Sequence, residues 1–196
     1  MTSPTPSQSA DERSLSAGQQ ADPQRWDAKP ARGETRRLSL ALQGGGSLGA
    51  FAWGVLDRLL EDEDLTFEAV SGASVGAVNA ALVAAGLLAG GKPEARRRLD
   101  HFWERSSQMA PPNPGATATF LADMASRLMS PYQLNPSNLN PLEGLLSAEV
   151  DFEVLRATPP LRLLIAATSV SNGRLRIFQE TELTRDMVLA SAVCRC

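Results

Sequence analysis

Two glycine-rich turns constrain the fold of this chain more than any other feature of its sequence. The first, at residues 44–49, follows the short apolar run 38–42, and the second, at residues 72–76, follows another apolar run at 67–70. A helical pattern of apolar residues begins directly after each turn. Short apolar runs that end at glycine are typical of buried strands. The repeated order of strand, turn and helix therefore predicts parallel strands joined by helices.

The rest of the chain continues this alternation. Glycine and proline residues at 90–93 break the chain between a small-residue helix at 77–88 and another helix that extends to about residue 103. The apolar run 161–167 predicts a third strand, and residues 175–178 predict its return partner. Helices interleaved with buried strands predict an α/β fold with a parallel or mixed sheet covered on both faces.

Residues 1–36 differ in composition from the rest of the chain. They are dominated by Ser, Pro, Gln, Ala, Asp and Arg, and Trp26 is their only large aromatic residue. Such a segment cannot bury enough apolar surface to offset the entropy that is lost on ordering. The whole chain is 43% apolar, which is enough for a core. We therefore predict a disordered tail at 1–36 and one domain at 37–196.

No segment predicts secretion or insertion into a membrane. The first residues lack a charged head followed by an apolar run, and no stretch of about 18 apolar residues follows later. We therefore expect a cytoplasmic protein. Phe120, Met124 and Leu128 share one face of a helical pattern, which we predict to pack in the core. The alternative is a lid or interfacial patch in transient, peripheral contact with a membrane surface.

Charge and cysteine content argue against several classes of function. The net charge of -3 gives no overall attraction to phosphate backbones, so we expect no nucleic-acid partner. The basic residues 96–98 lie within an apolar pattern of helical spacing, which indicates a solvated helix face. The two cysteines, Cys194 and Cys196, suit neither a disulfide framework nor a zinc site with four ligands. We expect no metal and no cofactor.

Ser74 lies at the centre of a G-x-S-x-G motif, between Gly72 and Gly76. A serine on such a sharp bend between strand and helix projects its hydroxyl into open space, and glycine neighbours let the helix and the strand approach closely. The serine also precedes a helix whose free N–H groups favour nearby negative charge. The motif therefore predicts Ser74 as a catalytic nucleophile.

The earlier turn supplies a second element of the same chemistry. Gly44, Gly45, Gly46 and Gly49 follow a predicted strand and open a helix. Acyl transfer places negative charge on a carbonyl oxygen, and a glycine turn presents unobstructed N–H donors to that oxygen. Losing one such donor typically costs ~10²- to 10³-fold in rate. We therefore predict an oxyanion hole at Gly44, Gly45 and Gly46.

Two alternatives compete with this prediction. The spacing of Gly44, Gly46 and Gly49 also fits the dinucleotide fingerprint G-x-G-x-x-G, which expects an acidic residue near the end of the next strand, about 20 residues on. Here that strand ends at Ser71, and the acidic run 61–64 comes before the strand begins, so we expect no nucleotide. The other alternative is a pair of purely structural glycine turns around a buried serine.

Four stretches of the chain together carry a resemblance to a known family. They are 44–49 with Gly54-Val55-Leu56, 72–77 with Asn79, 130–142, and 166–168 with Gly173-Arg174 and Phe178. Together they resemble the signatures of bacterial patatin-like phospholipases over residues 38–192. The resemblance implies a three-layer α/β/α fold with a central, mostly parallel sheet. It also implies a Ser-Asp dyad that cleaves acyl esters of phospholipids or other acyl-ester lipids.

The resemblance assigns roles to individual residues. It implies that Ser74 is the nucleophile, that the amides around Gly45 and Gly46 form the oxyanion hole, and that Gly44 and Gly49 shape the turn. His101 precedes any place where the chain order of a Ser-Asp-His hydrolase would put its histidine, so we interpret it as a surface or boundary residue.

The sequence departs from the family pattern in two places. Leu48 stands where many members carry Arg or Lys, so no cation accompanies the glycine loop. The family's aspartate belongs to an Asp-Gly motif well after a stretch like residues 190–192, and no Asp-Gly pair occurs in this sequence. We therefore expect the C-terminal part of the fold and its aspartate to be missing, which would leave the chain weakly active or inactive. The alternatives are a base at Asp151 or Asp186, or a catalytically inactive lipid-binding or regulatory remnant.

Overall fold

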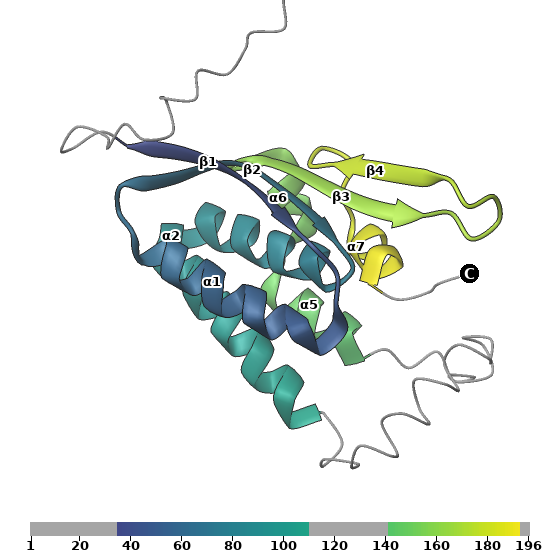
Figure 1. Ribbon diagram of the computed structural model, residues 1–196, viewed down its shortest axis with the longest axis horizontal. Coiled ribbons are helices and arrows are strands. Elements are labelled where there is room, and N and C mark those ends of the chain that lie inside the picture. The colour runs from purple at the N-terminus through teal and green to yellow at the C-terminus, as the bar shows by residue number, and fades with distance from the viewer. Residues whose placement is uncertain (1–34, 110–140, 193–196) are drawn as a thin grey trace, which may run out of the picture. The chain divides into compact units, whose positions relative to one another are not determined.

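The computed structural model describes residues 35–109 and 141–192 of the chain (Figure 1). The chain divides into two units, Met1–Glu34 and Thr35–Cys196, and all described residues belong to the second. Nearly all of the predicted tail therefore lies outside the described residues. The predicted helix face of Phe120, Met124 and Leu128 and both cysteines also lie outside them.

Strands and helices alternate along the described chain. In chain order they are β1 (Arg36–Leu42), the 3-10 turn η2 (Gly46–Leu48), α1 (Gly49–Glu61), β2 (Leu65–Ala73), α2 (Val75–Met109), α5 (Pro141–Glu149), α6 (Phe152–Ala157), β3 (Arg162–Thr168), β4 (Leu175–Gln179) and α7 (Arg185–Ala192).

The strands of the described residues form one mixed sheet in the order β1-β2-β3-β4 (Figure 1). β1, β2 and β3 are parallel, and β4 pairs antiparallel with β3. Parallel neighbours need a long crossover, and helices supply it between β1 and β2 and again between β2 and β3. The predicted α/β fold with a mostly parallel sheet is confirmed, and so is the return strand predicted at 175–178.

One face of the sheet is apolar and buried by helices. Val70 pairs with Leu163, and Gly72, Ile165 and Phe178 pair in a row across three strands. Because alternate residues of a strand point to the same face, these positions share one face, and all of them are buried. α2 and α7 contact the sheet, and α1 packs on α2 (Figure 1). The turns after β1 and β2 therefore emerge from a packed core.

Glycines break α2 where the sequence predicts a break. Gly90 and Gly91 have non-helical backbone angles, and Gly91 has a φ of 74°, a left-handed value that glycine adopts without steric cost. The chain then folds back: a Cβ placed on Gly86 would lie only 2.2 Å from the Cα of Ala95. The two halves of α2 therefore cross in close contact near the break.

Among the described helices, α2 alone has the length and apolar composition of a membrane span. Its most apolar window is 61% buried inside the protein, and the break at Gly90 and Gly91 interrupts the helix. Residues 76–86 are all buried, and most of them belong to the core cluster. The apolar character of α2 is therefore explained by its place in the core.

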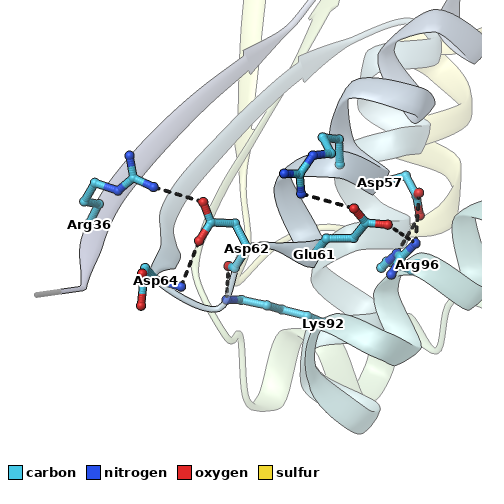
Figure 2. A network of polar contacts seen from close by, with 8 residues as sticks. Arg36, Asp57, Glu61, Asp62, Asp64, Lys92 and Arg96 are labelled. Atoms are coloured by element: carbon cyan, nitrogen blue, oxygen red, sulfur yellow. Dashed lines mark hydrogen bonds and ion pairs between the residues drawn. The ribbon is translucent and has the colours of Figure 1, made fainter. Parts of the chain in front are cut away.

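A polar network ties the second half of α2 to α1 and to the turn before β2 (Figure 2). Arg96 donates to Asp57 at 2.7 Å and to Glu61 at 2.8 Å, both on α1. Lys92 Nζ donates to the backbone oxygen of Asp62 at 2.7 Å. The hydrogen bond to Asp57 is the main reason that the pKa of Arg96 is raised above its ordinary value. These contacts hold the second half of α2 against α1.

The other two arginines of the predicted basic face pair with Glu94. Nε of Arg97 lies 2.8 Å from one Glu94 carboxylate oxygen, and Nε of Arg98 lies 2.8 Å from the other. All three arginines at 96–98 are therefore paired with carboxylates, which neutralise much of the positive charge of this segment.

Glu94 is expected to make the free energy of unfolding depend on acid pH. The hydrogen bond from Arg97 is the largest cause that lowers the pKa of Glu94 from 4.5 to about 2. Because the folded-state pKa is the lower one, this contribution is complete above pH 4.5 and is lost as the pH falls toward 2. Urea unfolding should show that this pair's contribution to the free energy of unfolding, less than about 1 kcal/mol, is lost between pH 4.5 and about 2, because such surface pairs are weak. Glu94→Gln should lack this loss.

The exposed Glu63, whose carboxylate is in none of these ion pairs, supplies the matched control, and Glu63→Gln should keep the pH profile of the wild type. Identical profiles for the wild type and Glu94→Gln would contradict the prediction.

Candidate active site

Ser74 joins β2 to α2 with a backbone φ of 55°, the one positive φ of a non-glycine residue in the described ranges. This left-handed conformation costs an L residue about 1–2 kcal/mol, so the surrounding packing must hold it. Gly72 and Gly76 permit that packing. A Cβ on Gly72 would lie 2.4 Å from the Gly76 carbonyl oxygen, and a Cβ on Gly76 would lie 2.3 Å from the Leu42 carbonyl oxygen. The G-x-S-x-G segment therefore forms a sharp and strained bend.

Ser74→Gly is expected to be more stable to unfolding than Ser74→Ala by about 0.5–1 kcal/mol. Glycine adopts the φ of 55° without steric cost, and part of that gain is offset by the greater entropy of glycine in the unfolded chain. Both variants lack the hydroxyl, so the comparison isolates backbone strain. Urea unfolding measures the difference. Equal stability of the two variants would indicate a relaxed bend.

The glycine loop after β1 lies directly against the serine turn. A Cβ on Gly44 would lie 2.8 Å from the Ser74 Cβ and 3.5 Å from its Oγ. Gly46 has a φ of 58°, which favours glycine at that position. Within the described part of the chain, no acceptor takes a hydrogen bond from the backbone N–H of Gly44 or Gly45. The structure thus brings together the two turns whose cooperation the sequence predicts.

Ser191, on α7, joins the serine turn to β3. The backbone N–H of Ser74 donates to Ser191 Oγ at 2.8 Å, and Ser191 Oγ donates to the backbone oxygen of Ala166 at 2.6 Å. Sequence reasoning missed this contact, because it used Ser191 only as part of a stretch that resembles the family. No local pattern could have revealed a bond between residues that lie 117 positions apart.

Asn79 fixes the other side of the glycine loop. Its fully buried side chain donates to the backbone oxygen of Gly49 at 3.1 Å and accepts from Trp103 Nε1 at 3.0 Å. Gly49 itself leaves no room for a side chain, since a Cβ there would lie 2.6 Å from a methyl group of Val75. The buried side-chain amide of Asn79 therefore joins the start of α2 to the start of α1 and to the second half of α2.

A cavity of about 920 Å³ opens beside the two turns. Ser74 and Gly46 lie on its wall together with apolar side chains, which include Trp53, Phe102, Trp103 and Leu142. The rings of Trp53 and Trp103 stack with their centroids 6.4 Å apart and their planes within 10°. Volumes of roughly 300–1,000 Å³ with apolar walls and a few polar groups are typical of sites for small organic ligands.

Asp151 and Asp186, the alternative bases considered from the sequence, have other contacts, and so has His101, which was predicted to lie at the surface or a boundary. Asp151 caps α6 by accepting hydrogen bonds from two backbone N–H groups of that helix. His101 contacts the buried carboxylate of Glu149, and Asp186 lies in the first turn of α7. Among the described residues, no side chain is hydrogen-bonded to Ser74 Oγ.

Two carboxylates that sequence reasoning did not select lie on the cavity wall. They belong to Asp100 and Glu104, on the second half of α2. Both residues are exposed. In the described ranges, no group of three or more His, Cys, Asp or Glu side chains is arranged to hold a metal ion.

Comparison with known proteins gives one match to a family and one to a solved structure. The sequence model of the family described as patatin-like phospholipase matches residues 40–196. Curated protein sequences give no match. The solved structure is the heterodimeric complex ExoU-SpcU from the type III secretion system of Pseudomonas aeruginosa, with 18% sequence identity and a TM-score of 0.35. That match covers 81% of this chain and 36% of the other, so this chain spans about a third of the length of that protein.

Proposed function

Because this chain belongs to the patatin-like phospholipase family, a family of lipid hydrolases, we propose that it carries the nucleophile and the oxyanion loop of a lipid acyl hydrolase. Ser74 is the nucleophile in this proposal, and the backbone amides of Gly44, Gly45 and Gly46 are the oxyanion donors. The substrate is a phospholipid or another acyl-ester lipid.

The observation that carries the proposal is the close approach of the glycine loop to the strained serine. Ser74 Oγ would lie 3.5 Å from a Cβ on Gly44, so an ester carbonyl attacked by this oxygen lies within reach of the amides of the loop. The N–H of Ser74 itself already donates to Ser191. The donors to an oxyanion must therefore come from other amides, and Gly44 and Gly45 have theirs unbonded within the described residues.

The proposed reaction has two steps. Ser74 Oγ bonds to the ester carbonyl carbon, the alcohol part of the lipid leaves, and water then hydrolyses the acyl-enzyme. In the first step a base takes the Ser74 hydroxyl proton and passes it to the leaving alcohol, and in the second it takes a proton from the attacking water and returns it to Ser74 Oγ. The family's dyad mechanism assigns this base to an aspartate. The apolar wall of the cavity with its stacked Trp53 and Trp103 suits an acyl chain.

Exposed apolar side chains next to the glycine loop support a lipid surface as the place of reaction. Leu48 is 75% exposed and Phe51 is 79% exposed. Leu48 ends η2 and Phe51 lies in the first turn of α1, immediately after the predicted oxyanion donors. Single exposed apolar residues are common, but this pair lies beside the glycine loop, on the wall of a second cavity of about 380 Å³, which favours transient contact with a membrane surface.

A second candidate function is that of a lipid-binding protein without catalysis. It is favoured by one observation: among the described residues no side chain is hydrogen-bonded to Ser74 Oγ, although the apolar cavity is present. A lipid-binding protein would use the same cavity and the same class of lipid as the hydrolase, but Ser74 would not be activated for attack.

A fluorophosphonate probe distinguishes the two candidates. We expect the full chain to be labelled on the peptide that contains Ser74 and to release fatty acid from phosphatidylcholine vesicles only slowly, because no Asp-Gly pair occurs in this sequence, with release inhibited in proportion to labelling. Folded protein that binds a fluorescent fatty acid saturably but is neither labelled nor active would overturn the hydrolase and favour the binding protein.

A further inference from the structure

The hydroxyl of Ser191 lies where the ladder between β2 and β3 ends. The last pair of that ladder joins Ala73 to Ala166, and Ser74 is the next residue of the chain. Instead of continuing the ladder, Ser74 donates its N–H to Ser191 Oγ at 2.8 Å, and Ser191 Oγ donates to the Ala166 oxygen at 2.6 Å. The side chain of Ser191 thus replaces the direct backbone hydrogen bond that the sharp bend at residues 72–76 (the elbow) prevents.

The two bonds are mutually dependent. A serine hydroxyl has one proton and two lone pairs. Since the proton of Ser191 is donated to the Ala166 oxygen, a lone pair faces the N–H of Ser74, and the elbow is held in one orientation. A methyl group at this position would leave both backbone groups without their partner in a half-buried place.

The helix that carries Ser191 is itself firmly placed. Val188 and Leu189 on α7 are completely buried in the core cluster. Ala192, the neighbour of Ser191, lies on the wall of the cavity beside Ser74. The hydroxyl therefore reaches the elbow from a fixed support that also shapes the cavity.

We propose that Ser191 is a positioning residue for Ser74, an inference that rests on the proposed hydrolase function. It holds the strained φ of 55°, which aims Ser74 Oγ at the glycine loop. It also occupies the Ser74 N–H, so that this donor does not compete with the loop for a substrate carbonyl. Ser191 touches the serine turn through its hydroxyl and has no part in bond making.

The test compares three variants in the full chain. Ser191→Ala removes both bonds, and Ser191→Thr keeps the hydroxyl. Thr184→Ala is the matched control, because the Thr184 side chain accepts from the N–H of Met187 at 3.3 Å at the start of the same helix and is not hydrogen-bonded to Ser74. Thr184→Ala therefore weakens α7 without touching the elbow.

The first readout is the rate constant for fluorophosphonate labelling at Ser74, together with kcat and KM for a soluble ester. We expect Ser191→Ala to lower the labelling rate and kcat by roughly 10- to 100-fold at nearly unchanged KM, because small displacements of a reacting atom have large effects on rate. Ser191→Thr should stay within about 3-fold of the wild type, because it keeps the hydroxyl that makes both hydrogen bonds. Thr184→Ala should lower the melting temperature and leave the labelling rate unchanged.

The second readout is hydrogen exchange of the Ser74 amide, measured by NMR, which does not require activity. We expect exchange to be at least about 10-fold faster in Ser191→Ala than in the wild type, and unchanged in Ser191→Thr. Equal loss of labelling in Ser191→Ala and Thr184→Ala, or unchanged exchange in Ser191→Ala, would overturn the positioning role. An unlabelled wild type in which Ser191→Ala still exposes the Ser74 amide would instead overturn the proposed hydrolase and leave the contact established.

Discussion

Ser74→Ala is expected to abolish fluorophosphonate labelling and to reduce ester hydrolysis to the background rate. Alanine removes only the Oγ atom. The backbone bonds of the elbow, from the Ser74 N–H to Ser191 and from the Ala77 N–H to the Ser74 oxygen at 2.9 Å, do not depend on that atom. A nucleophilic serine is the site of acyl-enzyme formation, so its loss removes the covalent route entirely.

The control for this variant is Ser147→Ala, which changes an exposed serine on α5. It should label and hydrolyse like the wild type. Labelling that persists at another residue in Ser74→Ala, with unchanged fatty-acid release, would show that the nucleophile lies elsewhere.

Gly44→Ala is expected to lower the labelling rate and ester turnover by at least about 100-fold. The added methyl group would lie 2.8 Å from the Ser74 Cβ and 3.3 Å from the Ala73 carbonyl oxygen, a spacing that requires one of the two turns to move. Gly44 does not have a positive φ, so alanine fits its backbone conformation and the effect is steric. The displacement would move the proposed nucleophile, Ser74, away from the amides of the glycine loop.

Gly54→Ala is the matched control, because it adds the same methyl group on α1 where no atom lies within 4 Å. Alanine also favours a helix more than glycine does, so this variant should be as active as the wild type and at least as stable. If Gly44→Ala retained wild-type labelling and turnover, the close approach of the two turns would have no role in the chemistry.

The sequence predicted the parts of this fold that depend on local signals. The turns at 44–49 and 72–76 and the break at Gly90 and Gly91 are marked by glycine, whose backbone freedom those conformations require. The parallel direction of β1, β2 and β3 follows from the same pattern, since strands joined by helical crossovers are typically parallel. Boundaries were less predictable: β2 extends over Leu65–Ala73, beyond the apolar run at 67–70, because its polar residues face away from the core.

Contacts between distant residues could not be predicted from local patterns. Asn79 and Ser191 carry hydrogen bonds that tie the two turns to the rest of the site, and each bond joins elements far apart in the chain. The short helix α6 was also missed. Asp151, weighed as an alternative base, is instead the residue that begins that helix, since aspartate is a favoured N-cap.

The fold-back of α2 places both halves of the helix on the wall of the cavity beside Ser74. One half of this helix begins directly after Ser74, and the other half carries Trp103, Asp100 and Glu104 on the cavity wall, with Gly90 and Gly91 between the two. The bend at the glycines and the ion pairs of Arg96 set the distance between the halves. If the cavity holds the acyl chain of the proposed substrate, mutations at that bend would widen or narrow the space for this chain while leaving Ser74 and the glycine loop in place.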